Sequence, residues 1–134
     1  MLHTQPRPTE MQETVFIVDD DEAVRDSLQW LIETEGYQVK TYAGPELFLE
    51  RLVWPQPCVL LLDIRMPKLS GLEVQKTLNE RGIPIPIVFI TGHGDVTLAV
   101  ETTKNGAVDF LEKPFDEGKI KDLIHQHMRL AHEL

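Results

Sequence analysis

Polar side chains follow the short apolar runs of this sequence, at positions that a general role in solubility does not explain. Asp19 and Asp20 close one run, Asp63 closes a second, and Thr91 and Lys113 close two more. Three carboxylates that lie together repel one another, and the pKa of at least one of them rises unless a cation compensates. If the fold gathers these run ends, the residue types predict a cation site with a lysine and a hydroxyl beside it.

A hard divalent ion with oxygen ligands is the natural compensator for such a group of acids. Mg²⁺ fits best because it keeps several waters and needs only one or two carboxylates, and Mn²⁺ is the expected substitute. The ion can polarise a phosphoryl group and direct it onto a carboxylate that acts as nucleophile. Because phosphoryl transfer depends mainly on positioning and charge neutralisation, Lys113 can bind one phosphoryl oxygen and the Thr91 hydroxyl another.

The segments that carry these residues alternate between short apolar runs and longer amphipathic ones. Almost continuous apolarity over residues 15–18, 58–62 and 87–90 is typical of strands buried on both faces of a parallel sheet. Two less apolar strands are expected over residues 38–42 and 108–112. The apolar positions of the intervening segments recur with helical spacing. They predict five helices, over residues 22–35, 45–52, 71–82, 96 to a stop at 105–106, and 120–131.

Five strands that alternate with five helices predict an α/β fold, a flavodoxin-like doubly wound parallel sheet with right-handed crossovers. The expected strand order is 2-1-3-4-5. Sites in such sheets lie beyond the carboxyl ends of the strands, near the point where the strand order reverses. The polar residues named above all stand at those ends, so we expect them to converge although they span most of the sequence.

Each of these residues also has a plainer structural explanation. Asp21 is best explained as the cap of the first helix, and Asp63 alone could form a turn at a strand end. Thr91-Gly92 and Lys113-Pro114 are common loop dipeptides, and each taken separately favours a loop role. The presence of a polar residue at every expected strand end is what favours the functional interpretation.

Composition predicts one domain and disfavours several classes of protein. A chain of 134 residues with 42% apolar content matches one compact domain, and we expect a disordered tail over residues 1–13 and a domain over 14–134. The formal net charge of −9 disfavours direct nucleic-acid binding. No apolar run reaches the roughly 20 residues of a membrane span, so we expect a cytoplasmic protein. The single cysteine, Cys58, excludes an intrachain disulfide.

Five segments around the predicted site carry a family resemblance. They are Val18-Asp19-Asp20-Asp21-Glu22, Asp63-Ile64-Arg65-Met66-Pro67, Gly71, Thr91-Gly92-His93-Gly94-Asp95 and Glu112-Lys113-Pro114-Phe115. Together they resemble the receiver domain of two-component response regulators, and they are most similar to the FixJ-type transcriptional regulators. The resemblance covers about residues 14–132.

The resemblance implies a role for each acid of the predicted site. Asp63 is the implied phosphoacceptor, Asp20 a direct metal ligand, and Asp19 a ligand through water or the residue that orients that water. The backbone carbonyl of Arg65 is a further implied ligand. Because none of the family's acidic positions is missing, the resemblance argues against an inactive receiver.

The resemblance also implies a switch around the phosphoryl group, with Thr91 and Lys113 as its contacts. Phosphorylation would add negative charge beside Thr91, so we expect its hydroxyl to swing toward the phosphoryl group and Phe110 to fill the space it leaves. Arg65 and His93 are expected to flank the pocket and tune hydrolysis of the acyl phosphate, although a simple loop role for His93 is equally open. The family tends to hold the peptide bond after the lysine in cis, which predicts a cis Lys113-Pro114 bond.

The implied function is that of a signalling phosphoacceptor, not of an enzyme with an external substrate. It would catalyse only its own phosphorylation, with a sensor histidine kinase as donor, and its own dephosphorylation. The face made by the fourth helix, fifth strand and fifth helix is then expected to change shape and shift monomer toward homodimer. FixJ-type proteins usually continue into a helix-turn-helix domain that binds DNA, which this sequence does not contain, so it is either a truncated or a stand-alone receiver.

Two rival functions share parts of this pattern. A flavodoxin-like cofactor binder would need a hydroxyl-rich or glycine-rich phosphate loop after the first strand, where this sequence has acids. Gly92-His93-Gly94 opens the segment after the fourth strand, but Thr97 stands where the third glycine of a dinucleotide fingerprint belongs. A phosphatase that forms an aspartyl-phosphate intermediate would carry a second acid two residues after Asp63, where this sequence has Arg65.

Overall fold

The computed structural model describes residues 13–54, 57–64, 71–92 and 109–133. Its strands are β1 (Thr14–Val18), β2 (Gln38–Tyr42), β3 (Cys58–Asp63), β4 (Ile87–Thr91) and β5 (Asp109–Glu112). Its described helices are α1 (Glu22–Glu33), α2 (Pro45–Arg51), α3 (Gly71–Glu80) and α5 (Glu117–Ala131). The fourth expected helix, which starts at residue 96, and most of the expected tail lie outside the described residues.

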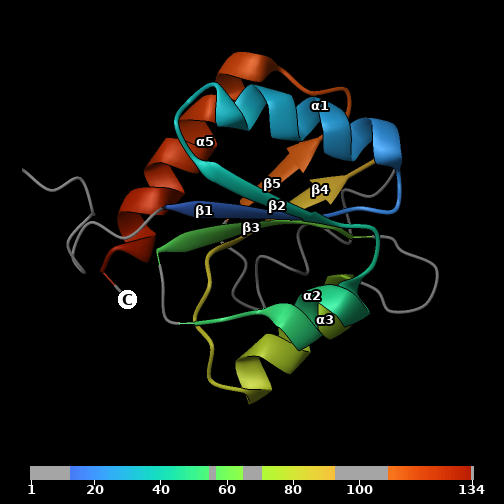
Figure 1. Ribbon diagram of the computed structural model, residues 1–134, viewed down its shortest axis with the longest axis vertical. Coiled ribbons are helices and arrows are strands. Elements are labelled where there is room, and N and C mark those ends of the chain that lie inside the picture. The colour runs from blue at the N-terminus through green and yellow to red at the C-terminus, as the bar shows by residue number, and fades with distance from the viewer. Residues whose placement is uncertain (1–12, 55–56, 65–70, 93–108, 134) are drawn as a thin grey trace, which may run out of the picture.

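The five strands form one parallel sheet in the order β2-β1-β3-β4-β5, which confirms the predicted fold and strand order. Helices α1 and α5 cover one face of the sheet, and α2 and α3 cover the other (Figure 1). Because every strand runs in the same direction, the carboxyl ends of β1, β3, β4 and β5 share one edge of the sheet. This is the edge at which the sequence places its polar residues.

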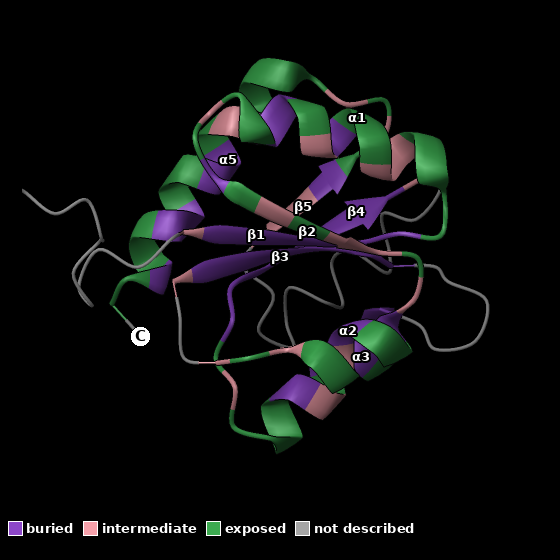
Figure 2. Ribbon diagram, in the orientation of Figure 1, coloured by how far each residue is buried: buried purple, intermediate pink, exposed green. Residues whose placement is uncertain are grey.

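The core consists of two layers, one on each side of the sheet. One cluster joins the sheet to α1 and α5, and the second joins it to α2 and α3. Successive residues of β1 alternate between them, since Val15 and Ile17 belong to the first cluster and Phe16 and Val18 to the second. The central strands are therefore buried on both faces (Figure 2), as their continuous apolarity predicted. None of the described helices is both long and apolar enough to cross a membrane.

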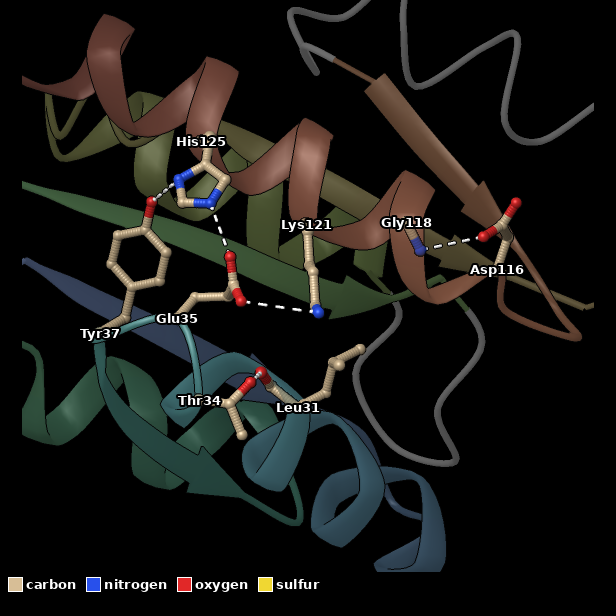
Figure 3. Close-up of polar contacts among 8 residues, drawn as sticks. All are labelled: Leu31, Thr34, Glu35, Tyr37, Asp116, Gly118, Lys121 and His125. Atoms are coloured by element: carbon tan, nitrogen blue, oxygen red, sulfur yellow. Dashed lines mark hydrogen bonds and ion pairs between the residues drawn. The ribbon is translucent and has the colours of Figure 1, made fainter.

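Side-chain caps define the helix ends nearest to the site. Asp21 caps α1 by accepting a hydrogen bond from the Ala23 amide at 2.9 Å, which confirms its predicted role. Helix α1 ends two residues before the expected Glu35, because the Thr34 hydroxyl donates to the Leu31 carbonyl and the chain then turns. At the start of α5, the Asp116 side chain accepts a hydrogen bond from the Gly118 amide in the same way (Figure 3).

A polar cluster ties α5 to the turn between α1 and β2 (Figure 3). The His125 ring lies between the Tyr37 hydroxyl, which it contacts through Nδ1, and the Glu35 carboxylate, which lies 3.0 Å from Nε2. The Lys121 ammonium lies 3.6 Å from the other oxygen of Glu35. The hydrogen bond from His125, more than the nearby Lys121 charge, lowers the pKa of Glu35. This cluster lies near the amino end of β2, away from the edge that carries the polar strand ends.

Candidate functional site

Three carboxylates from two separate segments lie together at the carboxyl edge of the sheet. Asp19, Asp20 and Asp63 each present an oxygen, and these oxygens all lie within 4.8 Å of one another. Asp19 is fully buried and Asp63 is nearly so, whereas Asp20 is exposed. The acids that the sequence places 43 to 44 positions apart therefore meet in one pocket that is open to solvent on the side of Asp20.

A lysine faces the same group of acids from β5. The Lys113 ammonium lies 3.6 Å from Oδ2 of Asp19, and the lysine side chain is one-third exposed. The following peptide bond, Lys113-Pro114, is cis, as predicted. Among the described residues, Lys113 is the cation that faces these three carboxylates, so acids outnumber it in this part of the pocket.

Main-chain hydrogen bonds hold the strand ends in place around the pocket. The Asp19 amide donates to the Tyr42 carbonyl at 3.1 Å, and the Lys113 amide donates to the Thr91 carbonyl at 2.9 Å. The amide of Ile64, the residue after Asp63, donates to the Ile90 carbonyl of β4 at 3.0 Å. The hydrogen-bond ladder therefore continues one residue past the ends of β1, β3 and β5, so these site residues stand on hydrogen-bonded main chain.

The charge of the Asp19 carboxylate is only partly compensated by the groups around it. Its Oδ1 accepts a hydrogen bond from the Asp21 amide at 2.8 Å, but its buried Oδ2 has no hydrogen-bond partner among the described residues. The 3.6 Å separation from Lys113 is too long for a hydrogen bond. Burial raises the pKa of Asp19, and the Asp20 charge adds to this, while the Asp21 amide and Lys113 oppose it.

The unpartnered oxygen and the convergent carboxylates fit a hard divalent cation. Such ions bind oxygen ligands, and Mg²⁺ needs only one or two carboxylates because it retains water molecules. Asp20 is exposed and can reach a hydrated ion, while the buried Oδ2 of Asp19 offers an acceptor for one of its waters. The donor set of Asp19, Asp20 and Asp63 therefore matches the ion that the sequence predicted.

Thr91 ends β4, the strand beside β3, and Phe110 lies on β5, the next strand outward. The Thr91 side chain is buried, and its hydroxyl lies 3.5 Å from the Leu111 carbonyl, at the long limit of a hydrogen bond. Phe110 is partly buried and packs against the cluster between the sheet and α2 and α3. The weak contact of the hydroxyl means that little hydrogen-bond energy opposes its reorientation.

The structure also shows two site features that we did not assign from the sequence. Arg25 of α1 donates from Nη1 to the backbone carbonyl of Asp19 at 2.8 Å. Gly71, the first residue of α3, lies so close to Asp63 that an added Cβ would be 2.8 Å from the Asp63 carbonyl oxygen. The glycine was part of the family resemblance but without a physical reason, and no spacing rule pointed to Arg25.

Two predicted residues cannot be located in this geometry. Arg65, whose carbonyl was the implied further ligand, and His93, an implied tuning residue, both lie outside the described residues. Their roles stay predictions.

Comparison with known proteins identifies a family that matches most of this chain. Residues 15–125 match the family model described as response regulator receiver domain. The transcriptional regulatory protein FixJ of Bradyrhizobium diazoefficiens is 42% identical over 117 residues, which cover 87% of this chain and 57% of that protein. FixJ of Azorhizobium caulinodans is 48% identical over 79% of this chain and 50% of its own length.

Solved structures show the same likeness. The response regulator StyR superposes with a TM-score of 0.86 and 44% identity, covering 91% of this chain and 62% of its own. The crystal structure of FixJ-N superposes with a TM-score of 0.82 and 44% identity, covering 89% of this chain and 95% of its own. The chain spans 50% to 57% of the length of the first curated relatives that it matches.

Proposed function

Because this chain belongs to the response regulator receiver domain family, we propose that Asp63 is the residue that accepts the phosphoryl group. The observation that carries this proposal is the pocket itself. Its three carboxylate oxygens lie within 4.8 Å of one another, and the Lys113 ammonium lies 3.6 Å from Oδ2 of Asp19. Asp63 ends the central strand β3 and is 8% exposed, so its main chain is fixed while solvent still reaches the side chain.

In this proposal Asp19, Asp20 and Asp63 hold Mg²⁺, or Mn²⁺ in its place. Asp20 and Asp63 bind the ion directly, Asp19 binds through water, and the Arg65 carbonyl completes the protein ligands. When bound, the ion neutralises the acids and polarises the phosphoryl group. The buried Oδ2 of Asp19, which accepts no hydrogen bond from the part of the chain that the structure describes, supports its role toward a bound water, because a buried acceptor without a donor is costly.

The transfer step places the negative charge of the phosphoryl group between a lysine and a hydroxyl. A carboxylate oxygen of Asp63 forms a bond to phosphorus as the bond from phosphorus to the donor breaks. With a phosphohistidine as donor, the imidazole leaves and takes up a proton. Lys113 and Thr91 bind phosphoryl oxygens during this step, since Lys113 already faces the group of acids at Asp19 and Thr91 ends the strand next to β3.

The proposed output is a change in the region of β5 and α5. Thr91 turns toward the phosphoryl group, and Phe110 moves into the space that its hydroxyl leaves. The long 3.5 Å contact from Thr91 to the Leu111 carbonyl and the partial burial of Phe110 support this movement. Arg65 and His93 then tune how fast water hydrolyses the acyl phosphate, so the chain would dephosphorylate itself.

Partners and context are proposed from the family. A sensor histidine kinase supplies the phosphoryl group in the cytoplasm, and phosphorylation shifts the chain toward a homodimer. The curated relatives are about twice as long as the matched segment. We propose that residues 14–134 are the receiver part, preceded by a tail over 1–13, and that any transcriptional output acts through a DNA-binding domain outside these residues.

The rival functions fit the site less well. A flavodoxin-like cofactor binder would not need the acids that follow β1, and the cluster of carboxylates would repel a cofactor phosphate. A phosphatase for external substrates would share the aspartyl chemistry, so turnover of a small phosphate ester that disappears in Asp63→Asn would favour it.

Intact-mass analysis after incubation with acetyl phosphate and Mg²⁺ tests the proposal. The wild-type chain is expected to gain the mass of one phosphoryl group, and the gain should disappear in Asp63→Asn and when a chelator removes the metal. Asp109→Asn is a suitable control, because Asp109 lies on β5 away from the acidic pocket. An unchanged mass gain in Asp63→Asn would refute the assignment of the phosphoacceptor.

A further inference from the structure

The Arg25 guanidinium contacts the main chain of the acidic pocket, not its carboxylates. Its Nη1 donates to the carbonyl oxygen of Asp19 at 2.8 Å in a partly buried contact. We propose that Arg25 is a positioning residue of the cation site, which acts by fixing the peptide plane between Asp19 and Asp20. This inference rests on the proposed function, because it presumes that these acids bind a divalent cation.

The planarity of the peptide bond makes the Asp19 carbonyl an effective place to act. The carbonyl oxygen of Asp19 lies in one rigid plane with the amide and Cα of Asp20. A donor that holds this oxygen therefore also restricts the direction in which the Asp20 Cα, and with it the carboxylate, leaves the strand. Asp20 needs such a restraint because it is exposed and lies beyond the last residue of β1.

The other polar atoms of Asp19 are held from different directions. Its amide donates to Tyr42 of β2 at 3.1 Å, its Oδ1 accepts from the Asp21 amide at 2.8 Å, and its Oδ2 faces Lys113 at 3.6 Å. These contacts fix the residue on the side of β1 and within the pocket. Among the described residues it is Arg25 that contacts the carbonyl, so this bond restrains the rotation of the peptide that follows.

Arg25 is itself well anchored for this role. Its amide donates to the Asp21 carbonyl at 3.0 Å within the first turns of α1, whose start is capped by the Asp21 side chain. Its side chain then reaches back six residues to the end of β1. Hydrogen bonds from charged donors are stronger than those between neutral groups, so the contact can restrain one peptide.

Arg25 and Lys113 therefore have separate tasks in the pocket. Lys113 approaches the carboxylate of Asp19 and reduces the repulsion among the acids. Arg25 contacts a neutral carbonyl, and its loss should affect the geometry of the cation ligands more than their charge. The two tasks predict opposite results for Mg²⁺ affinity, because removal of a positive charge alone would strengthen cation binding.

Calorimetric titration of the metal-free protein with Mg²⁺ distinguishes these effects. Arg25→Gln is expected to raise the Mg²⁺ dissociation constant about tenfold, the lower end of what outer-shell partners of metal ligands contribute. Arg81→Gln is the matched control, since Arg81 also donates from Nη1 to a backbone carbonyl, that of Leu49 at 3.2 Å, but lies away from the pocket. It removes the same charge and should leave the affinity unchanged.

A second measurement does not depend on the metal. In ¹H–¹⁵N spectra of the metal-free protein, Arg25→Gln should shift the amide signals of Asp20 and Asp21, whereas Arg81→Gln should leave both in place. If Arg25→Gln does not fold, Arg25→Lys replaces it. Lysine keeps the charge but lacks the guanidinium fork, so the same changes are expected at smaller size.

Four outcomes would overturn the inference. They are an unchanged Mg²⁺ affinity in the Arg25 variant, tighter binding, an equal loss in Arg81→Gln, and unshifted amides of Asp20 and Asp21. Asp20→Asn separates this failure from failure of the proposed function. If wild type and Asp20→Asn bind Mg²⁺ equally, the cation site itself is refuted, whereas dependence on Asp20 but not on Arg25 refutes only the positioning role.

Discussion

Substitution of Gly71 by alanine tests whether the close contact between α3 and the end of β3 determines the geometry of the site. An alanine Cβ would lie 2.7 Å from Cε1 of Phe89, 2.8 Å from the Asp63 carbonyl oxygen and 2.9 Å from Cα of Ile64. Each distance is at least half an ångström below the 3.4 Å at which ordinary contact begins. Two of the three atoms belong to the main chain, and Phe89 is fully buried, so none of them can simply move aside.

The expected cost follows from these contacts. Overpacking of a well-packed core by one methyl group costs about 1–3 kcal/mol, and the gain of about 0.5–1 kcal/mol for replacing glycine in a helix offsets only part of it. At roughly 4 °C per kcal/mol for a domain of this size, Gly71→Ala should lower the melting temperature by a few degrees up to about 10 °C. Since the displaced carbonyl belongs to Asp63, the Mg²⁺ affinity should fall as well.

Thermal unfolding followed by circular dichroism, with and without Mg²⁺, measures both effects. Gly118→Ala is the matched control, because Gly118 also lies in the first turn of a helix but its Cβ would meet only Asp116 Oδ1, at 3.5 Å. The control should leave the stability unchanged or raise it by up to about 1 kcal/mol, the gain for replacing a glycine in a helix without a clash. A Gly71→Ala protein as stable as wild type, or an equal loss in Gly118→Ala, would refute the packing argument.

Three further predictions concern titratable groups. Burial raises the pKa of Asp19, so ionisation of this carboxyl lowers the stability of the folded chain as pH rises through the folded-state pKa. At pH 7.5 with a chelator present, Asp19→Asn should therefore have a higher melting temperature than wild type, but Mg²⁺ should raise its melting temperature by less. The hydrogen bond from His125 lowers the pKa of Glu35, so Glu35→Gln should be less stable than wild type at neutral pH, and urea titrations should show the difference vanishing as pH falls through that pKa. Burial raises the pKa of the Cys58 thiol to about 12, so a thiol-specific disulfide reagent should modify the native chain only as fast as it unfolds.

The fold could be predicted from the sequence because its strands and helices carry strong local patterns. Continuous apolar runs predicted β1, β3 and β4, and the buried layers on both faces of the sheet explain why those runs do not alternate with polar residues. Helix ends were predicted less accurately. Helix α1 ends at Glu33, where the Thr34 hydroxyl donates a hydrogen bond to the Leu31 carbonyl. The expected end at Glu35 was based only on Gly36 as a helix terminator.

Contacts made by long side chains could not be predicted in the same way. The His125 ring lies between Tyr37 and Glu35, about 90 positions earlier in the sequence, and no periodicity links these residues. Arg25 reaches the Asp19 carbonyl because its side chain is long and flexible, and a helical position alone does not say where such a side chain ends. These contacts depend on distances between elements, which local patterns do not contain.

The different burial of two adjacent acids, by contrast, follows from the alternation of side chains along a strand. Val15 and Ile17 face the layer of α1 and α5, and Asp19 continues this series by steps of two, as Asp63 continues Val59 and Leu61 in β3. Asp19 therefore lies on the side of α1 and α5 and is fully buried, whereas Asp20 does not belong to this series and is exposed.

The same alternation of side chains places Thr91 and Phe110, the proposed switch pair, on the opposite side of the sheet. Thr91 continues the series of Ile87 and Phe89, which belong to the layer of α2 and α3, and Phe110 pairs with Phe89 and packs on that layer. Lys113 continues from Leu111 on the side of α1 and α5. The groups that balance charge and the groups proposed to move thus approach the pocket from different faces, so Phe110 can change position without displacing the lysine that faces Asp19.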